Sequence, residues 1–237
     1  MSVFIATPEQ TEIVYPESDG QPIGENTIQF HWIVLIKQGL ESVFRDRPDV
    51  FVAGDLFWYP VEGNPKIRVA PDAMVVIGRP PGHRRSYLQW KEEGIPPQVV
   101  FEVQSPGNRT WELEQKLLFY EAHGVQEYYL YDPEFNELTG WQRQGNELVG
   151  IAPMNGWESP HLGIRFEMSG PELRIVRPDG HDFVTYAELE EQRDEIAQER
   201  DEIAQERDQI AQDRDLARQE VERLAARLRE LGVDPEA

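Results

Sequence analysis

The sequence predicts an α/β (α+β) domain with a mixed central sheet flanked by helices, followed by a C-terminal coiled-coil helix. Two patterns lead to this fold class: helical and strand-like spacings of apolar residues alternate along residues 25–180, and a seven-residue repeat follows them. The 237 residues suffice for one domain with a core of its own and an appendage. We therefore divide the chain into an irregular N-terminal arm (1–24), a folded domain (25–180) and an acidic coiled-coil tail (181–237).

The domain is expected to begin with a helix over residues 25–39. The arm before it is rich in proline, glycine and acidic residues and shows no sustained period. Apolar residues from Ile28 to Ile36 recur at helical spacing, and Gly39 is a suitable C-cap.

A hairpin and a long loop are expected next. One strand pattern starts at Val50, and a second covers residues 67–77 with a kink at Pro71. Residues 78–97 are rich in proline and glycine and predict a long loop, a kind of segment that often carries function. This loop holds the only concentrated positive charge in the first half of the chain, at His83, Arg84, Arg85 and Lys91.

The second half of the domain alternates strands with one helix. Residues 98–104 form a β-branched run that ends at Ser105-Pro106 and predicts a buried strand. A helix over 111–123 follows, with Asn108 or Thr110 as its N-cap and Gly124 as its stop. This order predicts a mixed sheet with helices packed against it. The remaining strands are expected at 125–131, 138–143, 147–151, 164–168 and 173–176.

The tail contains a strict seven-residue repeat that begins at Arg193 and decays after Arg214. Apolar residues fill one core position of the heptad, whereas arginine fills the other in four successive heptads. Two structures therefore stay open. One is a solvated single helix with ion pairs along its surface, and the other is a parallel oligomeric coiled coil held mainly by its last heptads, from Val221 to Leu231.

Composition excludes several kinds of site. The absence of cysteine excludes disulfides and thiolate zinc sites, and none of the five histidines pairs with another at metal-ligand spacing. No apolar run approaches the ~20 residues of a membrane span, so we expect a cytoplasmic protein with no membrane contact. The tail has 8 basic and 18 acidic residues, and the rest of the chain has 15 and 26. Such acidity opposes binding to nucleic acid unless divalent cations bridge carboxylates to phosphate.

Three charged residues are candidates for metal-dependent phosphodiester cleavage, which requires carboxylates and a nearby cation. Asp72 stands at the start of an apolar strand, where a turn aspartate is also common. Glu102 interrupts the run 99–103, where a carboxylate is paired, metal-bound or functional unless that sheet face is solvated. Lys116 flanks the inward face of the next helix, from which a lysine reaches either those carboxylates or water.

These residues carry a resemblance to a known family. Pro71-Asp72, then Phe-Glu102-Val-Gln-Ser-Pro106, then Lys116-x-x-x-Tyr120-x-x-x-Gly-Val-x-Glu-Tyr-Tyr-x-Tyr-Asp-Pro133 resemble the Uma-two family of restriction endonucleases, within the PD-(D/E)xK nuclease superfamily. The resemblance spans most of residues 20–180 and implies a restriction-endonuclease-like fold. It implies Asp72 and Glu102 as Mg²⁺ (or Mn²⁺) ligands and Lys116 as the third catalytic residue.

One position departs from the superfamily pattern. Gln104 stands where the E-x-K motif has lysine, and the resemblance implies that this lysine is relocated to the helix, at Lys116. A further early acidic residue is usual in the superfamily, and Glu25 or Asp55 could supply it.

We therefore expect a Mg²⁺-dependent endonuclease that acts on DNA and forms a homodimer, with the coiled coil as one means of pairing. The alternative is a catalytically silent relative that recruits partners through its coiled coil, which the overall acidity and Gln104 favour. A pure coiled-coil scaffold would leave the patterned globular sequence without a role.

Overall fold

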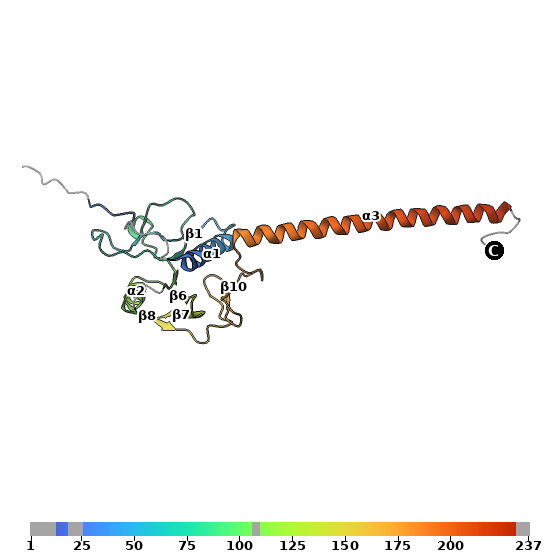
Figure 1. The fold of residues 1–237 in the computed structure, drawn as a ribbon. Helices are drawn as coiled ribbons and strands as arrows, with labels where there is room; N and C mark the ends of the chain where they lie inside the picture. Colours follow the sequence, from blue (N-terminus) through green and yellow to red (C-terminus); the bar gives the residue numbers. More distant parts are fainter. Residues whose placement is uncertain (1–12, 19–25, 106–109, 231–237) are drawn as a thin grey trace, which may run out of the picture. The chain divides into compact units, whose positions relative to one another are not determined.

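The computed structural model describes residues 13–18, 26–105 and 110–230 (Figure 1). The chain divides into two compact units, Met1–Thr185 and Tyr186–Ala237. The first unit contains all of the described strands and two α-helices, and the second contains one long helix.

The first unit is built on a six-stranded sheet in the order β1-β3-β5-β6-β7-β8. Only β5 and β6 run parallel, because helix α2 (Thr110–Ala122) connects them as a crossover, and the other neighbouring pairs are antiparallel. The predicted mixed sheet is thus confirmed. Its strands are β1 Val50–Ala53, β3 Ala73–Ile77, β5 Val99–Val103, β6 Glu127–Asp132, β7 Glu137–Gln144 and β8 Glu147–Gly150.

Two helices cover opposite faces of this sheet. α1 (Thr27–Val43) packs on the face that carries Phe101, and α2 packs on the face that carries Val100. Successive side chains of a strand point to opposite faces, so β5, which is buried at all five positions, contributes to both cores. β9 (Arg165–Glu167) and β10 (Arg174–Val176) form a small antiparallel sheet beside the α1 core.

The predicted hairpin exists, but its strands are shorter than expected. β1 and β3 pair antiparallel, and β1 ends at Ala53. The chain turns two residues later, where Asp55 has a left-handed φ of 47° and donates its N–H to the Pro71 carbonyl oxygen. This turn takes the following residues out of the large sheet, so the long second strand predicted over 67–77 is reduced to β3.

Residues 78–97 contain regular structure, so the prediction of an uninterrupted loop was wrong. β4 (Tyr87–Leu88) pairs in parallel with β2 (Trp58–Tyr59), and a 3₁₀-helix, η1 (Gln89–Lys91), follows. Tyr87 is fully buried and donates its hydroxyl to the Ile95 carbonyl oxygen at 2.7 Å. This buried anchor fixes a segment whose composition is typical of loops.

Gly39 does not end the first helix as predicted. α1 continues to Val43, and Phe44 is its C-cap. A Cβ atom added at Gly39 would lie 2.1 Å from the Cδ2 atom of Phe183, so glycine is required there for close packing. Phe183 belongs to the core on the α1 side, which therefore includes a side chain beyond residue 180.

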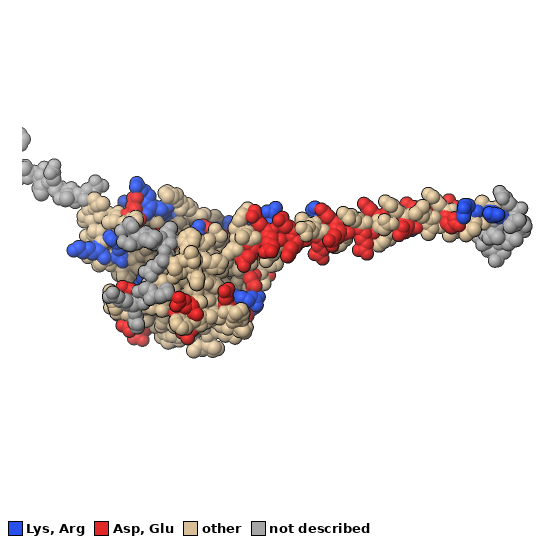
Figure 2. Space-filling model, in the orientation of Figure 1, with Lys and Arg blue, Asp and Glu red and all other residues tan. Residues whose placement is uncertain are grey.

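The second unit is a single helix over its described residues, α3 (Tyr186–Glu230). Acidic side chains cover much of its length (Figure 2). Its isoleucines at seven-residue spacing, Ile196, Ile203 and Ile210, are between 52% and 64% exposed. This exposure leaves both the single helix and the coiled coil open. Among the described residues, no helix combines the length and apolar character that a membrane span requires.

Candidate active site

The sheet register brings the two candidate carboxylates together. Ala73 pairs with Phe101 across the β3–β5 ladder, so Asp72 stands opposite Glu102 at the same end of the sheet. Glu102 alternates with Phe101 and therefore points to the face that α2 covers. Residues separated by 30 positions in the chain are thus adjacent because an antiparallel pair places the start of one strand beside the end of the other.

Glu102 is enclosed between the sheet and α2. Its side chain is 2% exposed, and its Oε2 accepts a hydrogen bond from Lys116 Nζ at 2.6 Å. Its Oε1 accepts a short hydrogen bond from the Tyr120 hydroxyl. Lys116 and Tyr120 are four residues apart on α2 and so lie on one helix face, directly above the strand. Lys116 and Glu102 are therefore in direct contact, as the position of the lysine on the helix predicted.

Asp72 is held by the backbone of the neighbouring strand. Its Oδ2 accepts the Val103 N–H at 2.7 Å. On the other side of the same residue, the Val103 carbonyl oxygen accepts Gln29 Nε2 at 2.8 Å. The end of β5 is therefore fixed from two directions, by Asp72 at the start of β3 and by α1.

Asp72, Glu102 and Lys116 change one another's ionisation. Burial raises the pKa of Asp72 well above its ordinary value, and the charge of Glu102 raises it further. Burial lowers the pKa of Lys116, but Glu102 and Asp72 outweigh this effect, so its pKa lies above the ordinary value. Lys116 is consequently an ammonium at neutral pH, suited to stabilise negative charge and unsuited to accept a proton.

Two carboxylates fit Mg²⁺, which binds through one or two carboxylates and keeps several waters. The described part of the chain contains no cluster of three or more His, Asp or Glu residues suited to a metal ion. Asp55, one of the two candidates for an additional acidic ligand, is exposed in the turn after β1. The other candidate, Glu25, lies outside the described residues, as does Asn108, one of the N-caps considered for α2.

A buried hydroxyl adds to the polar character of the site. Burial raises the pKa of Tyr128, and the charges of Glu102 and Asp72 raise it further. Within the residues that the structure describes, its hydroxyl has no hydrogen-bond partner. The charges of both carboxylates therefore act on this hydroxyl, which is itself fully buried.

Gln104 is the residue that replaces the usual lysine, and the structure places it just beyond β5. It lines a small pocket of about 270 Å³ with Asn26, Thr27 and Pro133, at the start of α1. No hydrogen bond in the described part of the chain joins its side chain to Asp72 or Glu102.

Sequence reasoning missed two residues of this cluster. Tyr120 stands in the motif that carries the family resemblance, but no contact with Glu102 was predicted for it, although its spacing of four from Lys116 signals a shared helix face. Gln29 was overlooked because Ile28 was taken as the inward position. In the structure Ile28 is exposed and Gln29 is buried on one stripe with Trp32 and Ile36. A lone glutamine within an apolar helical stripe was the available signal.

Family comparison agrees with the motifs. Residues 9–181, more than half of the chain, match the model of the Uma2 family, described as "Putative restriction endonuclease". The chain belongs to the Uma2 family. A solved structure described as "a putative nuclease belonging to DUF820 from Anabaena variabilis" shares 18% sequence identity with it at a TM-score of 0.42, covering 56% of this chain and 73% of that chain. Among curated proteins none matches this chain.

A second buried carboxylate of this Uma2 domain belongs to Glu127, the first residue of β6. Glu127 is fully buried and accepts hydrogen bonds from the Ser159 and Tyr129 hydroxyls, and its Oε1 lies 2.6 Å from His161 Nδ1. It pairs with Val99 at the start of β5, whereas Glu102 is near the end of that strand. Glu127 therefore anchors the chain around 159–161 and is separate from the Asp72 cluster.

The Glu127–His161 pair predicts a pH-dependent stability. Burial opposes ionisation of Glu127, but the hydrogen bonds from His161 and Ser159 outweigh it and lower the pKa below 4.5. The hydrogen bond to Glu127 raises the pKa of His161 above its ordinary value of 6.5. A lowered acid pKa stabilises the fold above pH 4.5, and a raised histidine pKa stabilises it below pH 6.5, so the pair contributes fully between these values.

We expect the wild type to be more stable than His161→Gln by about 1 kcal/mol near pH 6, and this advantage should shrink as the pH rises through the raised pKa of His161. Urea unfolding of both proteins between about pH 5 and 9 measures it. An advantage that is constant or grows with pH would contradict the charged pair.

Proposed function

We propose that this Uma2 protein hydrolyses phosphodiester bonds of DNA in a metal-dependent reaction, with Asp72 and Glu102 binding Mg²⁺ or Mn²⁺ and Lys116 assisting. One observation carries the proposal: Asp72 just before β3, Glu102 on β5 and Lys116 on α2 form a single polar cluster. Lys116 Nζ lies 2.6 Å from Glu102, and burial and the charge of Glu102 raise the pKa of Asp72. The membership of the chain in a family described as restriction endonucleases supports DNA as the substrate.

Each residue of the cluster has a separate role in the proposed reaction. A divalent cation bound by the two carboxylates would supply charge stabilisation and an activated water. Tyr120 holds the Glu102 carboxylate in place through a hydrogen bond from within the core. The Lys116 side chain is 31% exposed, so we expect its ammonium to contact a bound phosphate while it remains beside Glu102. Asp72 is fixed by the Val103 N–H, which orients its other oxygen.

Metal binding is the direct test of the carboxylate pair. We expect Mg²⁺ or Mn²⁺ to raise the unfolding temperature, because a ligand at 100 times its Kd adds about 2.7 kcal/mol of stability. Glu102→Gln keeps the shape of the side chain and should abolish the metal-dependent rise, whatever its own unfolding temperature. Glu147→Gln, an exposed position on β8, is the matched control and should keep the rise. Calorimetric titration that finds no binding at millimolar metal would count decisively against the site.

The catalytically silent module is the competing function, and Gln104 and the acidity of the chain favour it. It makes a different prediction for the same protein. A wild type that binds Mn²⁺ at Asp72 and Glu102 but leaves plasmid DNA intact would assign the domain to partner binding. We place the protein in the cytoplasm in either case.

We further propose that α3 pairs with α3 of a second copy in a homodimer. The apolar side chains at seven-residue spacing are exposed along one helix, and a parallel coiled coil would cover them. The arginines at the second core position weaken such a seam, so the pairing depends on Val221 and Leu224 near the end of the helix. A chain that ends at Thr185 would be unable to pair in this way.

A further inference from the structure

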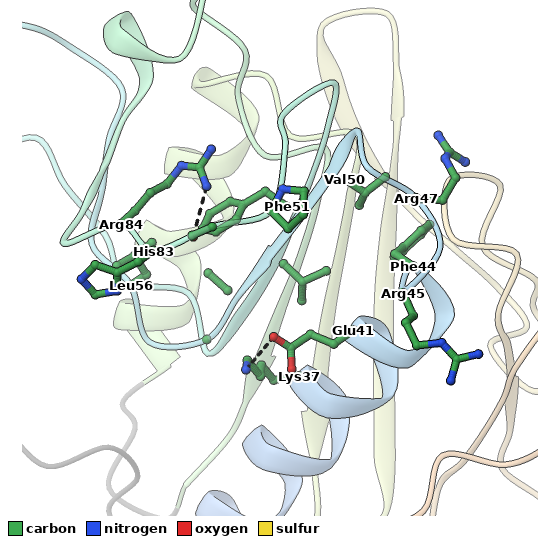
Figure 3. Close-up of a pocket in the computed structure, with 15 residues that line it drawn as sticks. Lys37, Glu41, Phe44, Arg45, Arg47, Val50, Phe51, Leu56, His83 and Arg84 are labelled. Atoms are coloured by element: carbon green, nitrogen blue, oxygen red, sulfur yellow. Dashed lines mark hydrogen bonds and ion pairs between the residues drawn. The ribbon is translucent and has the colours of Figure 1, made fainter.

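A groove of about 570 Å³ runs along β1, the edge strand of the large sheet (Figure 3). Its lining includes all four residues of β1 together with Gly54. Lys37 and Arg45 border it from α1 and the turn after that helix, and His83 and Arg84 border it from the loop on the other side of the strand. Within the described residues, the floor of the groove is therefore an edge of the sheet that pairs with no further strand.

Some backbone N–H groups of β1 have no partner among the residues that the structure describes. Gly78 donates its N–H to the Asp49 carbonyl oxygen, which makes 49 and 78 a hydrogen-bonded pair of the β1–β3 ladder. Along an antiparallel strand, residues whose backbone groups bond to the neighbouring strand alternate with residues whose backbone groups point away from it. Val50 and Val52 are of the second kind, so their N–H groups point away from β3. Such a row of donors binds either an extended chain or anionic oxygens.

The charge of the lining favours an anion. Although the net charge of the chain is −21, the groove is lined by four Lys or Arg residues and by only one acidic residue, Glu41. The basic residues are Lys37, Arg45, Arg47 and Arg84. Several of these cations have partners: Lys37 contacts Glu41 at 2.8 Å, and Arg47 contacts Asp49 at 2.8 Å. Exposed ion pairs of this kind contribute less than about 1 kcal/mol, so a phosphate can compete for the same cations.

Arg84 gives the groove one rigid wall. Its guanidinium lies 3.9 Å from the centre of the Phe51 ring, and its Nε donates to Glu92 at 2.8 Å. Arg45 and Arg47 are far more exposed, at 76% and 53% of their side chains. The groove thus combines a fixed cation on one side with two accessible ones on the other.

The groove ends at Gly54, which lies beside the backbone of Asp72. A Cβ atom added at Gly54 would lie 3.1 Å from the Asp72 carbonyl oxygen and 3.2 Å from Lys37 Cγ. Gly54 therefore packs closely against both the Asp72 backbone and the Lys37 side chain. A polyanion bound along β1 would therefore end beside the backbone of Asp72.

We infer that this groove binds the phosphate backbone of DNA and guides a strand to the Asp72–Glu102 site. The inference rests on the proposed function and names its substrate-binding surface. Two other occupants are less suited. A second copy of β1 would bring Arg45 and Arg47 of both chains together, with like charges opposed. An acidic peptide added to the sheet edge would use the same cations, but it would have no reason to end at Asp72.

Binding of a fluorescent DNA oligonucleotide to the full chain, measured by anisotropy in EDTA so that nothing is cut, tests the inference. We expect Arg45→Glu/Arg47→Glu to weaken binding about tenfold or more. The slope of the logarithm of the binding constant against the logarithm of the salt concentration should fall by roughly one to two, one for each arginine that no longer neutralises a phosphate. Arg218→Glu/Arg223→Glu on α3 is the matched control, because these arginines are similarly exposed, stand in surface ion pairs and give the same change of charge.

Several results would overturn the inference. The first is that the wild type does not bind the oligonucleotide at low salt, and the second is that Arg45→Glu/Arg47→Glu binds it as tightly as the wild type. The third is that both double variants bind equally weakly, which would indicate an effect of overall charge alone. Binding of a labelled polyglutamate peptide with none of the oligonucleotide would assign the groove to a protein partner instead.

Cleavage with Mn²⁺ separates the groove from the proposed function. If the protein binds DNA through Arg45 and Arg47 but does not cut it, the groove stands and the nuclease activity is rejected. If the protein cuts DNA while its binding is unaffected by the substitutions, the nuclease activity stands and the groove is rejected.

Discussion

Lys116→Ala is expected to lower Mn²⁺-dependent cleavage of plasmid DNA by a factor on the order of 10² or more, because removal of one preorganised charge at a reacting group typically costs that much. The expectation follows from the proposed function and from the position of the ammonium, 2.6 Å from Glu102. Its raised pKa keeps it charged at neutral pH, so its effect is on developing negative charge and not on proton abstraction.

Cleavage rates and unfolding temperatures of the same variants separate an effect on catalysis from an effect on stability. Lys116→Gln should be as inactive as Lys116→Ala, since it keeps a hydrogen-bond donor but lacks the charge. Both variants should still show the metal-dependent rise in unfolding temperature, because the carboxylates remain. Lys66→Ala, an exposed lysine in the turn before β3, is the control and should retain wild-type activity. Wild-type cleavage by Lys116→Ala would remove the lysine from the mechanism.

Glu102 and Lys116 could be selected as candidates from the sequence alone because the patterns that mark them are local. Glu102 interrupts five residues that are otherwise apolar, and all five are buried in the structure. Lys116 stands one turn before Tyr120 on a helix that follows this strand after a short connection. Burial cost makes a charge in such a place conspicuous in one sequence, without any knowledge of the fold.

Contacts between distant segments could not be predicted in this way. The hydrogen bond from Gln29 to Val103 joins residues 74 positions apart, and nothing in either local pattern specifies the partner. Gly39 illustrates the same limit: a glycine after a helical pattern usually marks a C-cap, and only the ring of Phe183 shows that here it allows close packing. Local propensity gave way to a tertiary contact.

The most destabilising change that we expect outside the site is removal of the chain after Gly180. Such a chain lacks Phe183, a buried core residue whose N–H also donates to the Ile175 carbonyl oxygen at 2.8 Å. Deletion of a buried phenylalanine costs about 3–5 kcal/mol. A chain that ends at Thr185 keeps this residue, and circular dichroism with urea unfolding should find it as folded as the full protein. Sedimentation should find it monomeric if α3 forms the proposed dimer.

A double-mutant cycle at Gly39 and Phe183 tests the physical reason for that destabilisation. Gly39→Ala alone should destabilise the protein by about 1–3 kcal/mol, because the new Cβ would lie 2.1 Å from the ring and overpack the core. Once Phe183→Ala has removed the ring, the same substitution should stabilise the helix by about 0.5–1 kcal/mol, since alanine is favoured over glycine in a helix interior. Phe135→Ala, an exposed phenylalanine, is the control and should leave the effect of Gly39→Ala unchanged. If Gly39→Ala has the same effect with and without the Phe183 ring, the two residues do not pack as described, and the end of the domain has to be placed before residue 183.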